Sequence, residues 1–513
     1  MASELSPFSI VGPGALGLNT KLAGLEIGPQ FCVSARNCAI SNEGTVTSRK
    51  GWDSFEGSSQ VAGGAPVRTV HEYIDSGSTS RMIWTTGNRI FENAITSDDV
   101  TGSITAPTED NWKFVNFNGK CIGVQDAHKP IVKVDGGDFS EISFDSAPVD
   151  PVDALAAWGR VWYVEADRET IKYSDLLQEG VLTSGSAGTL NMYTVWTNGY
   201  DEIVSLQEFN NSLVIFGRRQ IVIYGGADDP NNSLQLIDVV NNTGCIARDS
   251  IQNIGNDILF LGNEGVISFS RNVEAGGDVR SLPLANLSDN VSTFLSQFSS
   301  SEPRGNIKSA FKEDDGFYLL AFPASNITFY FNIRYPTEQS KARIFIWSGI
   351  DPTGLGTDRD NTLYIGRDGY LGRYTGYRDK GKSYNMNFKT GWVSGEGPVS
   401  AKTKIFKQAS MTIKGGYNSS VTFSWSFNFD PSTYDADVSP ASTQTQPSEY
   451  GIAEYGTGNY SRTSSVKQIL YRMSGSGKSL QFGISTEIDG AEITIQEVTV
   501  YLKNGKLSSR GRI

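Results

Sequence analysis

The 513-residue sequence predicts an all-β protein: an irregular β-propeller with a β-sandwich-like platform domain built from the N- and C-terminal parts of the chain. Three observations support this prediction. A strand–turn–strand pattern occurs seven times between Arg81 and Gly376, and longer strands that alternate apolar and polar residues follow it. The third is composition, because 55 glycines and only 19% charged residues are typical of a turn-dense β protein.

The N-terminal segment, residues 1–62, is punctuated by glycine and asparagine. Short strands are expected at residues 31–35 and 45–48. Glycine tolerates positive φ and close backbone approach, which suits a crossover between domains. We therefore expect this segment to join the platform domain.

Residues 63–380 contain the repeated pattern, in which an apolar strand, a tight polar turn and a second apolar strand follow one another. The mean spacing of the units is close to the roughly 40–50 residues of a four-stranded propeller blade. The gaps vary from 32 residues between Gly87 and Gly119 to 61 between Gly255 and Gly316, so no blade count is predicted. The alternative is a run of ordinary hairpins in one or two β-sandwiches. The first turns of the units are expected at Gly87, Gly119, Gly159, Asn211, Gly255, Gly316 and Asn361.

One helix is expected within this array, in the segment LPLANLSDNVSTFLSQF at residues 282–298. Ser288 is a candidate N-cap. Val291, Phe294, Leu295 and Phe298 recur at helical spacing and form an apolar stripe. We expect the stripe to pack on a blade edge, with a groove for a partner as the alternative.

The C-terminal part, residues 381–513, contains six longer strands. The residues from Val421 to Phe429 alternate strictly, which indicates a sheet with one buried face. Residues 431–465 are polar and contain scattered proline and tyrosine, and they fit either a subunit-contact arm or a solvent-exposed tail. The six strands are expected at residues 384–393, 402–416, 420–430, 465–475, 479–488 and 491–503.

The formal net charge of −12 argues against an adhesive nucleic-acid surface, which requires clustered lysine and arginine. The same negative charge is compatible with a protein wall that DNA slides past without binding. The first residues lack the basic start and apolar run of a signal peptide, and no apolar stretch is long enough to span a bilayer.

Metal and redox chemistry are not expected. The four cysteines, Cys32, Cys38, Cys121 and Cys245, contain no CxxC pair, and two histidines cannot complete a His-rich zinc site. Buried, reduced thiols are the expected state, which suits assembly in a cytoplasm.

Two glycine motifs resemble nucleotide-binding loops. Residues 12–17 spell GxGxxG, and residues 376–383 spell GxxxxGK[ST]. Such loops bind phosphate because a strand leads into the glycines and a helix N-terminus follows them. Neither segment is followed by a helical pattern, so no cofactor is expected.

No catalytic set is expected either, and the chain is predicted not to be an enzyme. A Ser–His–Asp set would need His71, which lies in an alternating strand, or His128, which lies in a turn. Neighbouring carboxylates such as Asp314 and Asp315 would point to opposite faces of a strand, whereas acid–base catalysis needs two that face one cleft.

Several short segments resemble the tail nozzle, or tail tubular, proteins of short-tailed bacteriophages. They lie at both ends and in the centre of the chain. The segments are GLNT at residues 17–20, Leu25, Asn37 with Cys38, RKGW at residues 49–52, residues 283–291, GRDG at residues 366–369, DKGK at residues 379–382, and the ending ITIQEVTVYLKNGK with Lys503, Lys506, Arg510 and Arg512.

This resemblance implies a non-catalytic structural subunit of a homohexameric ring at the tip of the virion tail, assembled in the host cytoplasm. The ring would attach to a tail adaptor protein near the tail fibres, contact the host cell surface, and conduct genomic DNA without sequence-specific binding. One alternative is a tail-associated propeller that binds or hydrolyses glycans through tyrosines and tryptophans. Another is a bacterial surface or scaffolding propeller.

Overall fold

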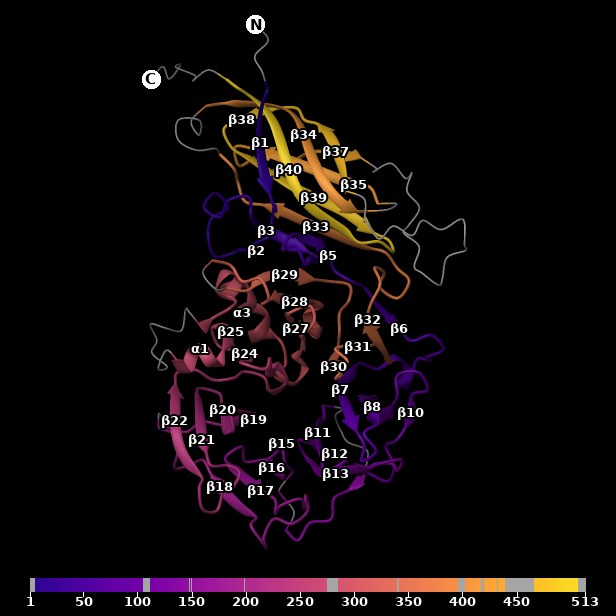
Figure 1. The fold of residues 1–513 in the computed structure, drawn as a ribbon, viewed down its shortest axis with the longest axis vertical. Coiled ribbons are helices and arrows are strands. Elements are labelled where there is room, and N and C mark those ends of the chain that lie inside the picture. Colours follow the sequence, from indigo (N-terminus) through magenta and orange to yellow (C-terminus); the bar gives the residue numbers. More distant parts are fainter. Residues whose placement is uncertain are drawn as a thin grey trace.

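The computed structural model describes residues 5–104, 111–146, 148, 150–197, 199–274, 285–338, 341–394, 402–416, 419–430, 432–438 and 466–505. The β-propeller and the β-sandwich platform lie one above the other (Figure 1). The prediction of an all-β fold with these two parts is confirmed. No described helix is long and apolar enough to cross a membrane.

Six units of four antiparallel strands surround the centre of the propeller in the described part of the chain. Apolar clusters fill the spaces between neighbouring units, so most central strands are buried on both faces. The first three units contain β7 (Val67–Ile74), β8 (Ser80–Thr86), β9 (Arg89–Glu92), β10 (Asp98–Asp99), β11 (Lys113–Phe117), β12 (Lys120–Gln125), β13 (His128–Val134), β14 (Ser140–Glu141), β15 (Asp153–Ala157), β16 (Arg160–Val164), β17 (Thr170–Tyr173) and β18 (Gly188–Asn191).

A smaller sheet of three strands, β23 (Gln252–Asn253), β24 (Ile258–Gly262) and β25 (Gly265–Ser268), lies between the fourth and fifth units. The fifth unit continues into the platform. The fourth to sixth units contain β19 (Ile203–Phe209), β20 (Ser212–Gly217), β21 (Gln220–Gly225), β22 (Gln235–Asn241), β26 (Lys308–Lys312), β27 (Phe317–Phe322), β28 (Ile327–Asn332), β29 (Arg343–Trp347), β30 (Gly354–Thr357), β31 (Leu363–Arg367), β32 (Tyr370–Tyr374) and β6 (Trp52–Ser54).

The propeller is closed by a strand from the N-terminal segment. Strand β6 is the outer strand of the last unit, where Trp52 pairs with Tyr374 and Ser54 with Gly372. The inner strand of this unit packs on the first unit, since a Cβ on Gly356 would lie 2.9 Å from a methyl carbon of Val70. Residues 52–54 were grouped with the platform from the sequence, and the structure places them in the propeller.

The turns explain the irregular repeat. Asn118 and Gly119, like Asn210 and Asn211, both have positive φ, as two-residue hairpin turns require. The prediction that Gly87 lies in the first turn of its unit is wrong. The unit begins one strand earlier, at β7, and its first turn is at residues 75–79, so Gly87 lies in the second turn, between β8 and β9. This shift shortens the gap to Gly119.

The longest gap contains helices. Helix α1 (Phe269–Glu274), the 3₁₀ helix η3 (Asp289–Val291) and helix α3 (Ser292–Ser301) are inserted between β25 and β26. Leu295 is fully buried, and the ring of Phe298 lies 5.8 Å from that of Phe329, so the stripe packs on β28 as expected. Ser288 does not cap α3. Its hydroxyl accepts a hydrogen bond from the backbone N–H of Val266 instead.

The remaining 3₁₀ helices that the structure describes are single turns. They are η1 (Ala62–Gly64), η2 (Arg248–Ser250), η4 (Arg304–Asn306) and η5 (Pro323–Ser325).

The platform consists of two packed sheets. One has the order β37-β34-β40-β5-β4, with β1 beside β40 and β38 beside β34. The other continues from β29 through β3 to β33-β39-β35-β36, and β2 pairs with β3. The strands are β1 (Ser6–Val11), β2 (Gly17–Leu18), β3 (Phe31–Arg36), β4 (Cys38–Ile40), β5 (Val46–Ser48), β33 (Tyr384–Thr390), β34 (Lys404–Gly415), β35 (Val421–Phe427), β36 (Tyr434–Val438), β37 (Val466–Arg472), β38 (Ser476–Gly477), β39 (Leu480–Ile488) and β40 (Ile493–Asn504).

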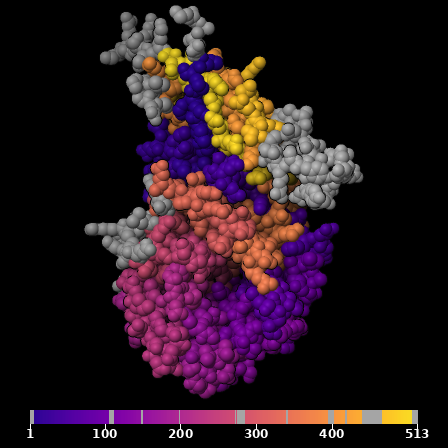
Figure 2. All heavy atoms as spheres, in the orientation of Figure 1, coloured from indigo at the N-terminus to yellow at the C-terminus, as the bar shows by residue number. Residues whose placement is uncertain are grey.

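Both ends of the chain therefore build the platform. In Figure 2 the indigo N-terminal residues lie beside the yellow C-terminal strands and extend down to the propeller. All six strands expected after residue 380 are present. In β35, Val421, Phe423 and Trp425 are buried as predicted, whereas Phe429 lies beyond the strand and is 57% exposed. Within the polar stretch 431–465 the structure shows β36, and residues 439–465 lie outside the described part.

Candidate functional site

The joint between platform and propeller is centred on Arg49. Its side chain is fully buried, and its two terminal nitrogens donate to the two carboxylate oxygens of Asp379 at 2.9 and 2.6 Å. The same guanidinium donates to the side chain of Asn37 at 3.0 Å and to the backbone oxygens of Lys50 and Ser348. All five of its N–H donors thus have an acceptor.

The surroundings stabilise this charge. The guanidinium carbon lies 4.0 Å from the ring centre of Tyr384, within the range of a cation–π interaction. Burial alone would lower the pKa of Arg49, but the bonds to Asp379 outweigh it and raise the pKa above its usual value. The guanidinium therefore remains charged, and its two bonds to Asp379 fix the N-terminal segment to the segment that leaves the propeller.

Backbone contacts extend the joint. The backbone N–H of Lys380 donates to the carbonyl of Trp52 at 2.7 Å, and that of Gly51 donates to Gly376 at 2.9 Å. A Cβ on Gly51 would lie 1.9 Å from the carbonyl oxygen of Arg378. RKGW and DKGK, which lie more than 300 residues apart, thus meet at one place.

The two nucleotide-like glycine motifs have structural roles. In residues 12–17, a Cβ on Gly14 would lie 2.7 Å from the sulfur of Cys32, and one on Gly17 would lie 2.6 Å from the backbone nitrogen of Ile344. In residues 376–383, Asp379 binds Arg49 and strand β33 follows. No helix follows either motif, so the structure lacks the dipole that a phosphate loop uses.

The histidines and cysteines are not brought together. All four cysteines are free and buried, and burial raises the pKa of each thiol, as for Cys245, where it reaches about 12. Within the described ranges, no group of three or more histidine, cysteine or acidic side chains could hold a metal ion. His128 lies at the start of β13, with its ring 4.9 Å from that of Trp112.

His71 lies on β7, and its Nε2 is 3.2 Å from the side-chain oxygen of Asn116. Burial lowers the pKa of His71 to about 4, the bond to Asn116 partly opposes this, and the charge of Lys113 adds to the lowering. The imidazole is therefore neutral at pH 7.

This lowered pKa predicts an acid-sensitive stability. The folded protein takes up the His71 proton only near pH 4, whereas an unfolded histidine does so near pH 6.5. The free energy of unfolding should therefore have its full value above pH 6.5 and decrease as the pH falls toward 4. The decrease should reach about 2 kcal/mol at about pH 4.5. We expect His71→Gln to remove this loss, as measured by urea unfolding of both proteins at neutral and acid pH. Identical pH dependence in the two proteins would contradict the assignment.

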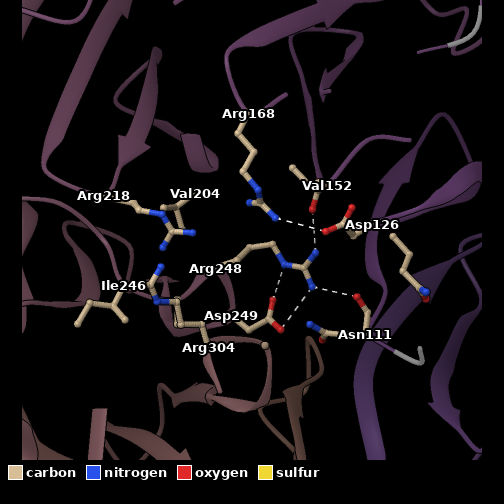
Figure 3. Close-up of a pocket in the computed structure, with 13 residues that line it drawn as sticks. Asn111, Asp126, Val152, Arg168, Val204, Arg218, Ile246, Arg248, Asp249 and Arg304 are labelled. Atoms are coloured by element: carbon tan, nitrogen blue, oxygen red, sulfur yellow. Dashed lines mark hydrogen bonds and ion pairs between the residues drawn. The ribbon is translucent and has the colours of Figure 1, made fainter. Parts of the chain in front are cut away.

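A polar cavity of about 240 Å³, open to solvent, lies between five successive sheets of the propeller. Four arginines and two aspartates line it, and Figure 3 shows how they converge. Arg248 is held in place, since it donates to the carbonyls of Val152 and Asn111 and to Asp249. Burial opposes ionisation of Asp249, but Arg248 and Lys308 outweigh it and hold the pKa of Asp249 well below its usual range. The lining residues are Asn111, Gln125, Asp126, Val152, Arg168, Val204, Arg218, Ile246, Ala247, Arg248, Asp249, Arg304 and Gly305.

No pattern of residues in the sequence indicated this cavity. Arg168, Arg218 and Arg304 lie in different units and share no local spacing, so only the closed ring brings them together.

Neither a protein-family model nor a curated protein matches the chain. Similar solved structures include the WD40 domain of Pan2 from Neurospora crassa, which is 9% identical over 64% of this chain and 95% of that chain, with a TM-score of 0.39. A second is PorZ from Porphyromonas gingivalis, 10% identical over 63% of this chain and 37% of that chain, with a TM-score of 0.34. A third is the computationally designed protein Ika8, 13% identical over 64% and 99%, with a TM-score of 0.35. At these identities, none bears on function.

Proposed function

We propose that this chain is a structural subunit of the ring at the distal end of a short bacteriophage tail, the nozzle through which the genome leaves the virion. The observation that carries the proposal is the joint. The RKGW and DKGK segments on which the resemblance to tail nozzle proteins rests contact each other through the buried pair of Arg49 and Asp379. A joint fixed by a fully bonded arginine suits a subunit that must remain rigid while copies close a ring.

The partners follow from this role. We propose six copies around the lumen, a tail adaptor protein and tail fibres as neighbours, the host cell surface as the distal contact, and the virion tail tip as the location. The net charge of −12 supports a lumen that DNA passes without being held, because binding needs clustered cations that release counterions.

The chemistry of the propeller cavity supports a role without catalysis. A carboxyl group can act as a general acid only if it is protonated near neutral pH, which a raised pKa provides. The pKa of Asp249 is lowered by its two cationic neighbours, so this group stays ionised. His71, which is not among the residues that line the cavity, has a pKa lowered to about 4, stays neutral and is bonded to Asn116.

The proposal predicts a closed oligomer that packs through the platform. Strand β37 is at the edge of its sheet and exposes Val466 and Leu470, at 58% and 57%. We expect V466E/L470E to lower the mass of the assembly, measured by light scattering, to that of one subunit, whereas the wild type has six times that mass. The matched control is L236E/I237E on β22, where two aliphatic residues of similar size are 47% and 57% exposed on the propeller. Loss of the assembly in the β22 variant alone would contradict packing through the platform.

A second candidate is a tail-associated propeller that binds or hydrolyses glycans. The observation that favours it is the exposure of Tyr193 and Tyr200, at 65% and 56%, between β18 and β19, because exposed aromatic rings can stack on sugars. Host envelope polysaccharide that is neither bound nor cleaved by the protein would remove this candidate.

A further inference from the structure

Three arginines in the propeller cavity are directed toward a common space. Arg168 lies in the turn between β16 and β17, Arg218 lies in the turn between β20 and β21, and Arg304 lies in η4. Figure 3 shows the guanidinium groups of Arg218 and Arg304 turned toward each other, with Arg168 extending into the same cavity. Each comes from a different unit, so the closed ring fixes their relative positions.

Their hydrogen-bonding capacity is largely unused. Arg218 donates from Nε to Glu202 at 2.7 Å, and no bond from its two terminal nitrogens is found within the described ranges. Arg168 lies 3.6 Å from Asp126, whose side chain is 66% exposed. The side chain of Arg304, in η4, makes no hydrogen bond or ion pair with any residue that the structure describes. Each guanidinium carries five donors, so most of these face the cavity or solvent.

The charges are also unbalanced. Arg218 and Arg168 each have one carboxylate partner, whereas Arg304 has none among the described residues. Partial burial lowers the pKa of Arg304, and the charges of Arg218 and Arg168 lower it further by mutual repulsion, which the charge of Glu202 only partly opposes. A bound anion would relieve this repulsion and supply the missing acceptors. This excess of positive charge is notable in a chain with a net charge of −12.

We propose that Arg168, Arg218 and Arg304 form a binding site for a phosphate group, either inorganic phosphate or the terminal group of a small phosphomonoester. A phosphate group supplies the negative charge that Arg304 lacks and offers acceptor oxygens in several directions. The planar guanidinium fork pairs with two such oxygens at once, which a lysine cannot do. A cavity of about 240 Å³ holds a group of this size. The site belongs to one subunit, so it does not depend on ring assembly.

The test is titration calorimetry of the full chain at low ionic strength with three probes: inorganic phosphate, phenyl phosphate and dimethyl phosphate. We expect the first two to bind at millimolar concentrations or below, and the diester, which carries one charge, to bind more weakly. Arg304→Gln and Arg218→Gln should each lower the affinity for phosphate by roughly tenfold, since each removes charge-assisted hydrogen bonds. Asp126→Asn should raise it, because the carboxylate that competes for Arg168 is removed.

The matched control is Arg89→Gln. Arg89 is 63% exposed and pairs with Asp99 at 2.9 Å outside the cavity, so its replacement should leave phosphate binding unchanged. Arg304 makes no bond to another described residue, so its glutamine variant should fold normally, which circular dichroism checks. The inference is overturned if inorganic phosphate and phenyl phosphate give no binding heat, or if R304Q and D126N bind phosphate as the wild type does.

Discussion

Replacing Arg49 by methionine is expected to lower the free energy of unfolding by about 3–5 kcal/mol. Methionine occupies a similar space but leaves the carboxylate of Asp379, whose side chain is only 11% exposed, without its bidentate partner. It also removes the bond to the backbone oxygen of Ser348 and one of the two bonds that the Asn37 side-chain oxygen accepts, the other coming from the backbone N–H of Ser348. Urea unfolding measures the effect as a lower midpoint with an unchanged slope.

Two comparisons separate the buried pair from a general loss of charge. Arg378→Met removes an arginine from the neighbouring exposed pair with Asp489, and we expect no measurable change in the midpoint. The double variant Arg49→Met/Asp379→Asn should lower the free energy of unfolding by less than the sum of the two single changes. The carboxylate that Arg49→Met leaves without a partner is then replaced by a neutral amide. Strict additivity would show that the two residues do not act as a pair.

Replacing Gly51 by alanine is expected to destabilise the protein by about 3 kcal/mol, at the upper end of the usual range for added volume in a packed interior. The new methyl group would lie 1.9 Å from the carbonyl oxygen of Arg378, which is backbone and cannot rotate away. Relief requires the segment before β6 to move, which would loosen the pairing of β6 with β32. Thermal unfolding followed by circular dichroism measures the loss.

The matched control is Gly136→Ala. A Cβ at Gly136 would meet no atom within 4 Å, and this residue, like Gly51, does not have a positive φ. Its replacement should therefore leave the midpoint unchanged. Equal midpoints for G51A and the wild type would mean that the joint is not as tightly packed as described.

The parts of the fold that could be predicted from the sequence are those with a local signal. The strict alternation from Val421 onward located β35, and paired asparagine or glycine residues such as Asn210 and Asn211 located hairpin turns. The turn after β7 was missed because its sequence, DSGST at residues 75–79, lacks the two-residue signature of a tight hairpin turn. The first unit was therefore placed one hairpin too late.

The joint and the cavity had no local signal. Strand β6 has three residues, and its partner β32 lies more than 300 residues away, so neither strand length nor periodicity identifies it. RKGW and DKGK could each be noticed, but their contact follows only from ring closure. The three arginines of the cavity lie on separate turns for the same reason. Long-range contacts of this kind depend on the order in which the strands close the ring. They have no regular residue spacing along the sequence that could reveal them.

The measurement that tests the central claim most directly is electron microscopy of the purified protein or of particles viewed along the tail axis. The account predicts a closed ring of six wedge-shaped subunits around an open or gated lumen, each with a propeller and a platform, and with the platforms in contact. Class averages that show single subunits, or an open chain of copies that never closes, would contradict it.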